Sequence, residues 1–229
     1  MEVDLSNLRY WCNDKFYPLM HDTHRYMVLM GGGGSGKSHF CAQKIVYRML
    51  ADPGIRILVV RKVKNTIKES VFTLLRDIIS EWELSPLFKY NMSDYGIMCV
   101  NGSQVITAGL DDVEKLKSIH KVSVVWVEEA TECDLADVRQ LDIRMRGKSA
   151  WYKQMMISFN PISVTHWLKK EFFDTENPDV ITCHSTYRDN HFLDAEQIKV
   201  LESFKKTDPY YYAVYCLIVT GKQIGRAHV

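Results

Sequence analysis

The chain has 229 residues, of which 46% are hydrophobic and 25% are charged, and its formal net charge is +1. This length suits one large α/β domain, or one domain with a small appendage. The near-neutral charge excludes a global basic field, so contact with nucleic acid would depend on a local patch. No apolar run approaches the roughly 18 residues of a membrane span, and we expect no membrane partner.

Apolar runs alternate with amphipathic segments along the chain, which predicts an α/β fold built on a mostly parallel, doubly wound sheet. Central parallel strands are expected at 26–30, 55–60, 122–127 and 154–159, and a further strand at 180–184. Asn101-Gly102 predicts a hairpin between strands near 96–100 and 104–108. Helices are expected at 37–50, 66–82, 135–143, 165–173 and after 194, with capping boxes at Thr66 and Asp194.

Residues 31–38 read Gly-Gly-Gly-Gly-Ser-Gly-Lys-Ser and match the P-loop pattern between an expected strand and an expected helix. Glycines let backbone N–H groups wrap phosphates, and the helix start favours anions. Lys37 would neutralise the β- and γ-phosphates, and Ser38 would bind Mg²⁺. The competing interpretation is a flexible glycine turn. The predicted nucleotide-binding residues are Gly31, Gly32, Gly33, Gly34, Ser35, Gly36, Lys37 and Ser38.

Two carboxylates follow a strongly apolar strand at 124–127, as in a Walker B segment. Glu128 would face the metal, and Glu129 would orient and deprotonate the attacking water. Asp is the usual first acid, so Glu128 is a departure whose longer side chain must retract or act through water. The alternative is a solvated strand end with two exposed acids. With Ser38, Glu128 is the predicted Mg²⁺ ligand.

A polar residue and several arginines complete the predicted catalytic set. Asn160 ends the strand at 154–159 and can both donate and accept hydrogen bonds to sense the γ-phosphate, although Asn160-Pro161 could simply form a turn. An arginine should offset transition-state charge. The candidates are Arg61, Arg144, Arg146 and Arg188, each of which could instead be structural; Arg144 is the one we assign to catalysis, with Glu129, Lys37 and Asn160.

The adjacent acids favour an ATPase of the additional-strand, catalytic-glutamate type. GTPases would also need an Asn-Lys-x-Asp base reader, and the sequence contains none. We therefore expect ATP and Mg²⁺ as cofactors and ATP hydrolysis as the activity. Lys115 and Lys117 could contact a nucleic-acid backbone or form a solvated helix face.

The motifs together resemble the N-terminal ATPase domain of the phage terminase large subunit, of the PBSX-like type. The matching stretches span roughly 31–220, and the Walker B and Phe-Asn-Pro contexts are fairly specific. These stretches are Gly-Gly-Gly-Gly-Ser-Gly-Lys-Ser (31–38), Val-Val-Arg-Lys (59–62), Gly-Leu-Asp-Asp-Val-Glu-Lys-Leu-Lys-Ser-Ile (109–119), Val-Trp-Val-Glu-Glu-Ala-Thr-Glu (125–132), Arg-Met-Arg-Gly (144–147), Ser-Phe-Asn-Pro (158–161) and Thr-Tyr-Arg-Asp-Asn (186–190).

The resemblance implies a motor that couples ATP hydrolysis to translocation of double-stranded DNA into a procapsid, in the cytoplasm of a bacterial host. It also implies three partners: the portal protein, the small terminase subunit and further copies of the chain in a ring, with a monomer as the alternative state in isolation. In the family pattern Asn160 falls in the coupling motif. Two other functions stay open: another P-loop DNA translocase such as a helicase-like ATPase, and a truncated domain that binds ATP with little turnover.

Three departures from the family pattern affect these expectations. Many relatives carry Arg at the position of Gly33, so an arginine contribution from the loop itself is in doubt. The family usually continues into a C-terminal nuclease domain, which we expect to be absent here, so that 1–221 is the ATPase domain and no nuclease activity is expected. Residues 224–229 match what a common sequencing-library adapter encodes, which predicts a non-native tail at 222–229.

Overall fold

The computed structural model describes residues 3–112, 116, 118–161, 163 and 165–218, which form an α/β fold around an eight-stranded sheet. The strands are β1 (Tyr26–Gly31), β2 (Arg56–Arg61), β3 (Phe88–Asn91), β4 (Gly96–Cys99), β5 (Gln104–Gly109), β6 (Val124–Glu128), β7 (Gln154–Phe159) and β8 (Val180–Ser185). The helices are α1 (Leu8–Trp11), α2 (Lys37–Ala51), α3 (Thr73–Glu81), α5 (Leu135–Arg144), α6 (Trp167–Phe172), α7 (Ala195–Thr207) and α8 (Pro209–Tyr211).

The sheet is mostly parallel, as the sequence predicted. Its strand order is β3-β4-β5-β2-β6-β7-β1-β8, and each neighbouring pair from β5 to β8 is parallel. Among the described strands, the antiparallel pairs are β3 with β4 and β4 with β5, at one edge of the sheet. Every residue of β6 and β7 is buried, which explains why both read as near-continuous apolar runs.

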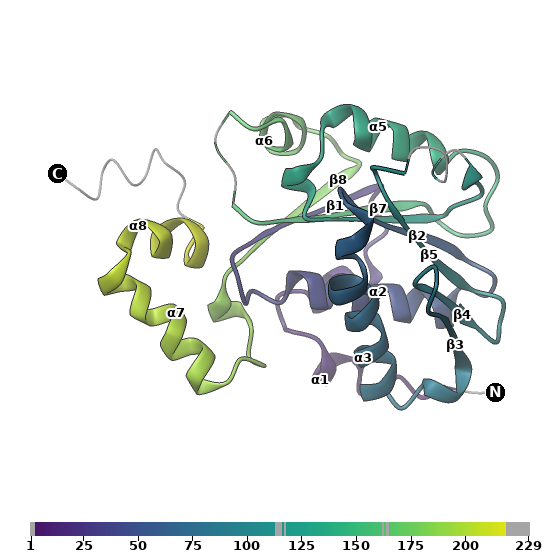
Figure 1. Cartoon of the computed structure of the whole chain (residues 1–229), viewed down its shortest axis with the longest axis horizontal. Helices are drawn as coiled ribbons and strands as arrows, with labels where there is room; N and C mark the ends of the chain where they lie inside the picture. The colour runs from purple at the N-terminus through teal and green to yellow at the C-terminus, as the bar shows by residue number, and fades with distance from the viewer. Residues whose placement is uncertain (1–2, 113–115, 117, 162, 164, 219–229) are drawn as a thin grey trace.

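Helices cover both faces of this sheet, so the doubly wound architecture is confirmed. Figure 1 shows α2 and α3 on one face and α5 and α6 on the other. Each face has its own hydrophobic core: residues such as Phe40 and Ile78 pack on one side, and Val138 and Leu168 on the other. Helices α7 and α8, at the left of Figure 1, lie beside the sheet rather than over it.

The order of the central strands determines where functional groups can meet. Strand β7 lies between β1, which leads into the P-loop, and β6, which ends at Glu128. This inserted strand is the additional strand that the sequence predicted. Because these three strands are parallel, their carboxyl ends reach the same edge of the sheet. Ligands of open α/β sheets bind at this edge.

Local predictions were confirmed at several helix ends and wrong at one. Asp194 and Gln197 form the expected capping box of α7. Thr66, by contrast, does not begin a regular helix, because its hydroxyl donates to the carbonyl of Val63 at 2.7 Å instead of accepting from the backbone. The segment passes through a 3-10 turn and a π-helical turn before α3 begins at Thr73.

Some features lay beyond the sequence predictions. Strand β3 was not predicted, because its four residues, Phe-Lys-Tyr-Asn, mix apolar and polar types without a clear period. The Asn101-Gly102 hairpin is confirmed between β4 and β5, with Gly102 at φ 87°. None of the helices in the described part of the chain has the length and apolar character needed to cross a bilayer. Lys115, Lys117 and the tail at 222–229 lie outside the described residues.

Two adjacent glycines of the P-loop differ sharply in their surroundings, which gives a testable prediction. A Cβ added at Gly32 would lie 1.9 Å from the carbonyl oxygen of Tyr215, whereas a Cβ at Gly33 would meet nothing within 4 Å. We expect Gly32→Ala to lower the free energy of unfolding by about 2 kcal/mol, because one backbone segment must move away from another. Gly33→Ala is the matched control and should be nearly neutral. Thermal and denaturant unfolding measure both, and equal effects would contradict the contact.

Candidate functional site

The P-loop (residues 31–38) joins β1 to α2 and has the geometry that anion binding requires. Gly31 ends β1, and Lys37 begins α2. Gly34 and Gly36 have φ values of 71° and 83°, in the left-handed region that glycine adopts without a Cβ penalty. The loop therefore places backbone N–H groups at the positive end of a helix of 15 residues.

Ser38 and Glu128 meet at the carboxyl edge of the sheet, as the sequence predicted for a metal site. The Ser38 hydroxyl donates to Glu128 Oε1 at 2.8 Å. A second hydroxyl, from Ser158, donates to the other oxygen of the same carboxylate. Hydroxyl and carboxylate oxygens are the hard donors that Mg²⁺ prefers, so this pair fits the predicted ion.

Glu128 is only 7% exposed, and its environment opposes ionisation. Burial raises the pKa of Glu128 above its ordinary value, while the hydrogen bonds from Ser158 and Ser38 and the charge of Lys37 act in the opposite direction. Lys37 is equally buried, and desolvation lowers its pKa. Both groups are therefore held in the protein interior at a cost that a bound anion and cation would offset.

Asn160 connects the lysine of the P-loop to the second carboxylate. Lys37 Nζ donates to Asn160 Oδ1 at 2.9 Å. The amide nitrogen of the same side chain lies 3.3 Å from Glu129 Oε2. The structure thus brings together three of the four residues predicted to be catalytic. Asn160 follows β7 directly, so the inserted strand places this amide between the other two groups.

Glu129 occupies a turn whose backbone is unusual for its residue type. Its φ of 55° and ψ of 49° lie in the left-handed region, which costs a side-chain-bearing residue about 1 kcal/mol. The chain leaves β6 abruptly here and enters a 3-10 turn at Ala130. Glu129 is partly exposed, unlike its neighbour Glu128, so a water molecule can reach its carboxylate.

Arg144, the fourth residue predicted to be catalytic, is not brought to this site within the chain. It ends α5, which begins near the carboxyl end of β6 and runs back along the sheet. Two residues earlier, Asp142 pairs with Arg25 at 2.6 Å, and Arg25 directly precedes β1. Arg144 therefore lies near the amino ends of the strands, the edge opposite to the P-loop.

The other arginine candidates have different surroundings. Arg61 ends β2 at the same edge as the P-loop, and its buried Nε has no hydrogen-bond partner within the described residues. Arg188 donates to the phenol oxygens of Tyr187 and Tyr212 at 3.3 and 3.2 Å, so it joins the segment after β8 to the C-terminal helical turns.

Several residues at the site were missed by the sequence analysis. Ser158 is one polar residue in an otherwise apolar stretch, and its register opposite Glu128 could have been anticipated from that signal. Asn13 had no such signal. Asn190 ends the matching stretch at 186–190, but its contact with the P-loop could not be foreseen, because the two residues are far apart in the sequence. The Asn190 amide donates to the carbonyl of Gly34 at 2.8 Å and accepts from the Asn13 amide at 3.1 Å.

This asparagine pair packs against the P-loop at Gly34 and Gly36. Asn13 is 4% exposed, and its amide nitrogen would lie 2.7 Å from a Cβ on Gly36. Its carbonyl oxygen accepts from the backbone of His191 at 3.1 Å, which fixes the orientation of the amide. The pair thus links the N-terminal segment, the P-loop and the segment after β8.

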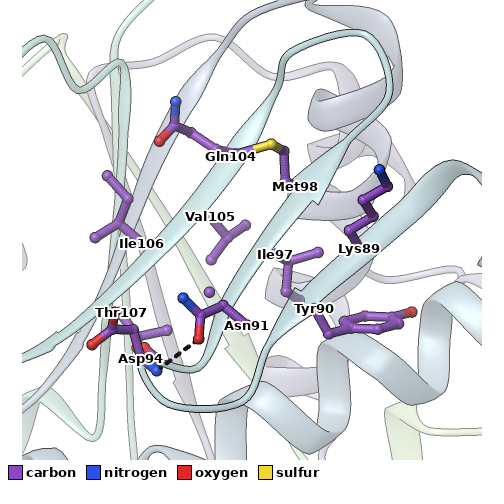
Figure 2. Close-up of a pocket in the computed structure, with 11 residues that line it drawn as sticks. Lys89, Tyr90, Asn91, Asp94, Ile97, Met98, Gln104, Val105, Ile106 and Thr107 are labelled. Atoms are coloured by element: carbon purple, nitrogen blue, oxygen red, sulfur yellow. Dashed lines mark hydrogen bonds between the residues drawn. The ribbon is translucent and has the colours of Figure 1, made fainter.

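A well-formed pocket elsewhere in the molecule is remote from this site. A cavity of about 380 Å³ lies over β3, β4 and β5. Figure 2 shows the side chains that line it, among them Tyr90, Ile97 and Val105. Three strands separate β5 from β1 in the sheet. The groups suited to catalysis therefore lie at the carboxyl edge of the sheet, around the P-loop. The size of a cavity does not by itself identify this site.

The buried carboxylate gives a prediction about stability. Because folding raises the pKa of Glu128 above its ordinary value of 4.5, folding favours the protonated form, and its contribution to stability falls as pH rises from about 4.5 through the folded-state pKa. We expect Glu128→Gln, measured with a chelator and without nucleotide, to be about 1 kcal/mol more stable at neutral pH. The difference from the parent should vanish toward pH 4. A less stable variant at pH 7 would show that the hydroxyl contacts outweigh desolvation.

Comparisons with known proteins are consistent with this geometry. A family model described as phage terminase large subunit matches residues 23–218. The PBSX phage terminase large subunit of Bacillus subtilis (strain 168) is 31% identical over 208 residues, covering 82% of this chain and 48% of that protein. The terminase large subunit of Bacillus phage SPP1 is 32% identical over 200 residues, covering 82% and 47%. The chain therefore spans about half the length of these curated relatives.

Solved structures show the same fold at lower identity. The large terminase from a thermophilic bacteriophage superposes with a TM-score of 0.71 at 16% identity, covering 93% of this chain and 52% of that one. The large terminase ATPase domain of Thermus phage P74-26 gives a TM-score of 0.63 at 16% identity, with 88% and 95% covered. With the family model matching most of its length, the chain belongs to the phage terminase large subunit family.

Proposed function

We propose that this chain is the ATP-hydrolysing motor domain of a viral DNA-packaging terminase, which couples hydrolysis to translocation of double-stranded DNA into a procapsid. The observation that carries the proposal is the placement of Asn160 between Lys37 and Glu129, beside the Ser38–Glu128 pair. A phosphate-binding loop, a buried metal ligand and a partly exposed carboxylate at one edge of a sheet form the set that nucleotide hydrolysis requires.

Each side chain has a defined task in the proposed reaction of ATP with water to give ADP and phosphate. The P-loop backbone and Lys37 hold the β- and γ-phosphates, so the ammonium exchanges its contact with Asn160 for phosphate oxygens. Ser38 and Glu128 would hold Mg²⁺, which supplies charge neutralisation of the phosphates when bound. Glu129 accepts a proton from the attacking water.

Asn160 has a further task, because its amide contacts both the lysine and the general base. When Lys37 moves to the phosphates, Asn160 Oδ1 becomes free to accept from the attacking water or from a neighbouring donor. Its amide nitrogen keeps Glu129 oriented in the meantime. Release of phosphate would restore the contact between Lys37 and Asn160. The Asn160 side chain therefore differs in its contacts between the nucleotide-bound and the empty site.

Structures of a relative support the choice of nucleotide. The large terminase of the thermophilic bacteriophage described above, which shares this fold, was crystallised in complex with ATP-gamma-S and with ADP. In our proposal the partners are double-stranded DNA, the portal protein and the small terminase subunit, and the setting is the cytoplasm of a bacterial host. Several copies would assemble as a ring. Arg144 could then supply charge only to a neighbouring copy, because it lies away from the site of its own chain.

The catalytic assignment is tested by separating binding from turnover. We expect Glu129→Gln to bind a fluorescent ATP analogue with nearly unchanged affinity and to lose at least about 100-fold in turnover, because the base is removed while the phosphate contacts remain. Lys37→Ala is the comparison variant and should lose binding itself. Equilibrium titration and phosphate release measure the two properties. If Glu129→Gln hydrolyses ATP at the parental rate, Glu129 is not the base.

The motor assignment is tested by adding the proposed partners. We expect ATP turnover of the 229-residue chain to rise about tenfold or more when portal protein and double-stranded DNA are present together, because ring assembly lets a neighbouring arginine complete the site. DNA alone should have a smaller effect. Strand separation of a duplex by the chain alone would instead favour a helicase-like translocase, and ATP binding without turnover under every condition would contradict the proposed motor.

A further inference from the structure

The direction in which a bound nucleotide must run can be deduced from the sheet. The γ-phosphate belongs beside Glu129 and Asn160, which follow β6 and β7. Strand β1 lies between β7 and β8, so the P-loop has the catalytic groups on one side and the segment after β8 on the other. A triphosphate wrapped on the P-loop therefore carries its α-phosphate, ribose and base toward the β8 side.

Aromatic rings are gathered on that side of the P-loop. Phe192 follows β8, and its ring is 50% exposed. Its centroid lies 6.5 Å from that of His39, which comes directly after Ser38 in the first turn of α2. His191 lies beside it with its ring tilted, at a centroid distance of 4.1 Å to Phe192. The three rings thus border the helix start where the α-phosphate would bind.

The same segment is fixed to the P-loop by hydrogen bonds. The backbone N–H of Phe192 donates to Asn190 Oδ1 at 3.2 Å, and the Asn190 amide donates to the carbonyl of Gly34 at 2.8 Å. One side chain thus couples the position of the ring to the position of the phosphate-binding backbone. An exposed ring at a fixed position beside an anion site suits a ligand that has a charged part and a flat apolar part.

We propose that Phe192 is the stacking platform for the adenine base of ATP, with His39 forming the adjoining wall. This inference rests on the proposed function, because it adds the base subsite to the phosphate site. The ring offers a π-face and, like other stacking platforms, no hydrogen bond that would distinguish one base from another. The subsite should therefore prefer purine to pyrimidine nucleotides and discriminate weakly between ATP and GTP.

The proposal is tested by comparing a ligand that has a base with one that lacks it. Isothermal titration with MgATP and with magnesium tripolyphosphate gives two dissociation constants for each variant. We expect Phe192→Leu to weaken MgATP about tenfold and leave tripolyphosphate unchanged. Phe192→Trp should bind MgATP at least as tightly as the parent. Asn190→Ala should weaken both ligands, since it releases the Gly34 carbonyl.

Controls separate this inference from the function on which it rests. Tyr210→Leu removes another exposed ring, 64% exposed on α8, and should change neither constant. If Phe192→Leu and Phe192→Trp both bind MgATP like the parent, the stacking assignment is wrong although the ATPase proposal stands. Equal weakening of both ligands by Phe192→Leu would also overturn it, since the ring would then act on the P-loop. If the parent binds neither ligand, the proposed function fails and the base subsite with it.

Discussion

The insertion of β7 between the P-loop strand and the acidic strand is the constraint on which the site depends. With β1 and β6 separated by one strand, Ser38 can still reach Glu128, and the intervening strand contributes Ser158 and Asn160 to the space between them. Ser158 lies on β7, and Asn160 comes two positions later, just past the end of the strand. If β6 paired directly with β1, neither the second hydroxyl on the carboxylate nor the amide beside Lys37 would have a place.

The charged groups of this site are held in surroundings that disfavour their charged forms. Lys37 and Glu128 are both 7% exposed, and burial shifts the pKa of each toward the neutral form. Glu129 keeps a left-handed backbone that its residue type disfavours. Strain and desolvation concentrated at one edge are typical of sites that are completed by a ligand. The surrounding parallel strands, buried on both faces, supply the rigidity that holds these groups in position.

The site residues that could be predicted from the sequence are those whose chemistry and local pattern indicate the same role. The P-loop, the two adjacent acids and Asn160 are each signalled by residue type at a strand end, and parallel strands bring such ends together. Sequence reasoning failed where contacts depend on the path of the whole chain. The catalytic role of Arg144 stays a prediction, but its position was not foreseen, because the length and direction of α5 carry it to the opposite edge of its own chain. Thr66 matched a capping pattern, yet its hydroxyl bonds to Val63, a local competition that spacing alone does not resolve.

The P-loop conformation itself depends on contacts that no motif reveals. Asn190 holds the carbonyl of Gly34 from 156 positions away in sequence, and the backbone of Tyr215 packs so closely on Gly32 that no side chain fits between them. Both contacts come from the chain after β8. A loop that closes around phosphates must carry these neighbours with it or lose the contacts. A shift of the P-loop would therefore also displace the segment that contains α7 and α8, because close-packed backbone cannot deform independently.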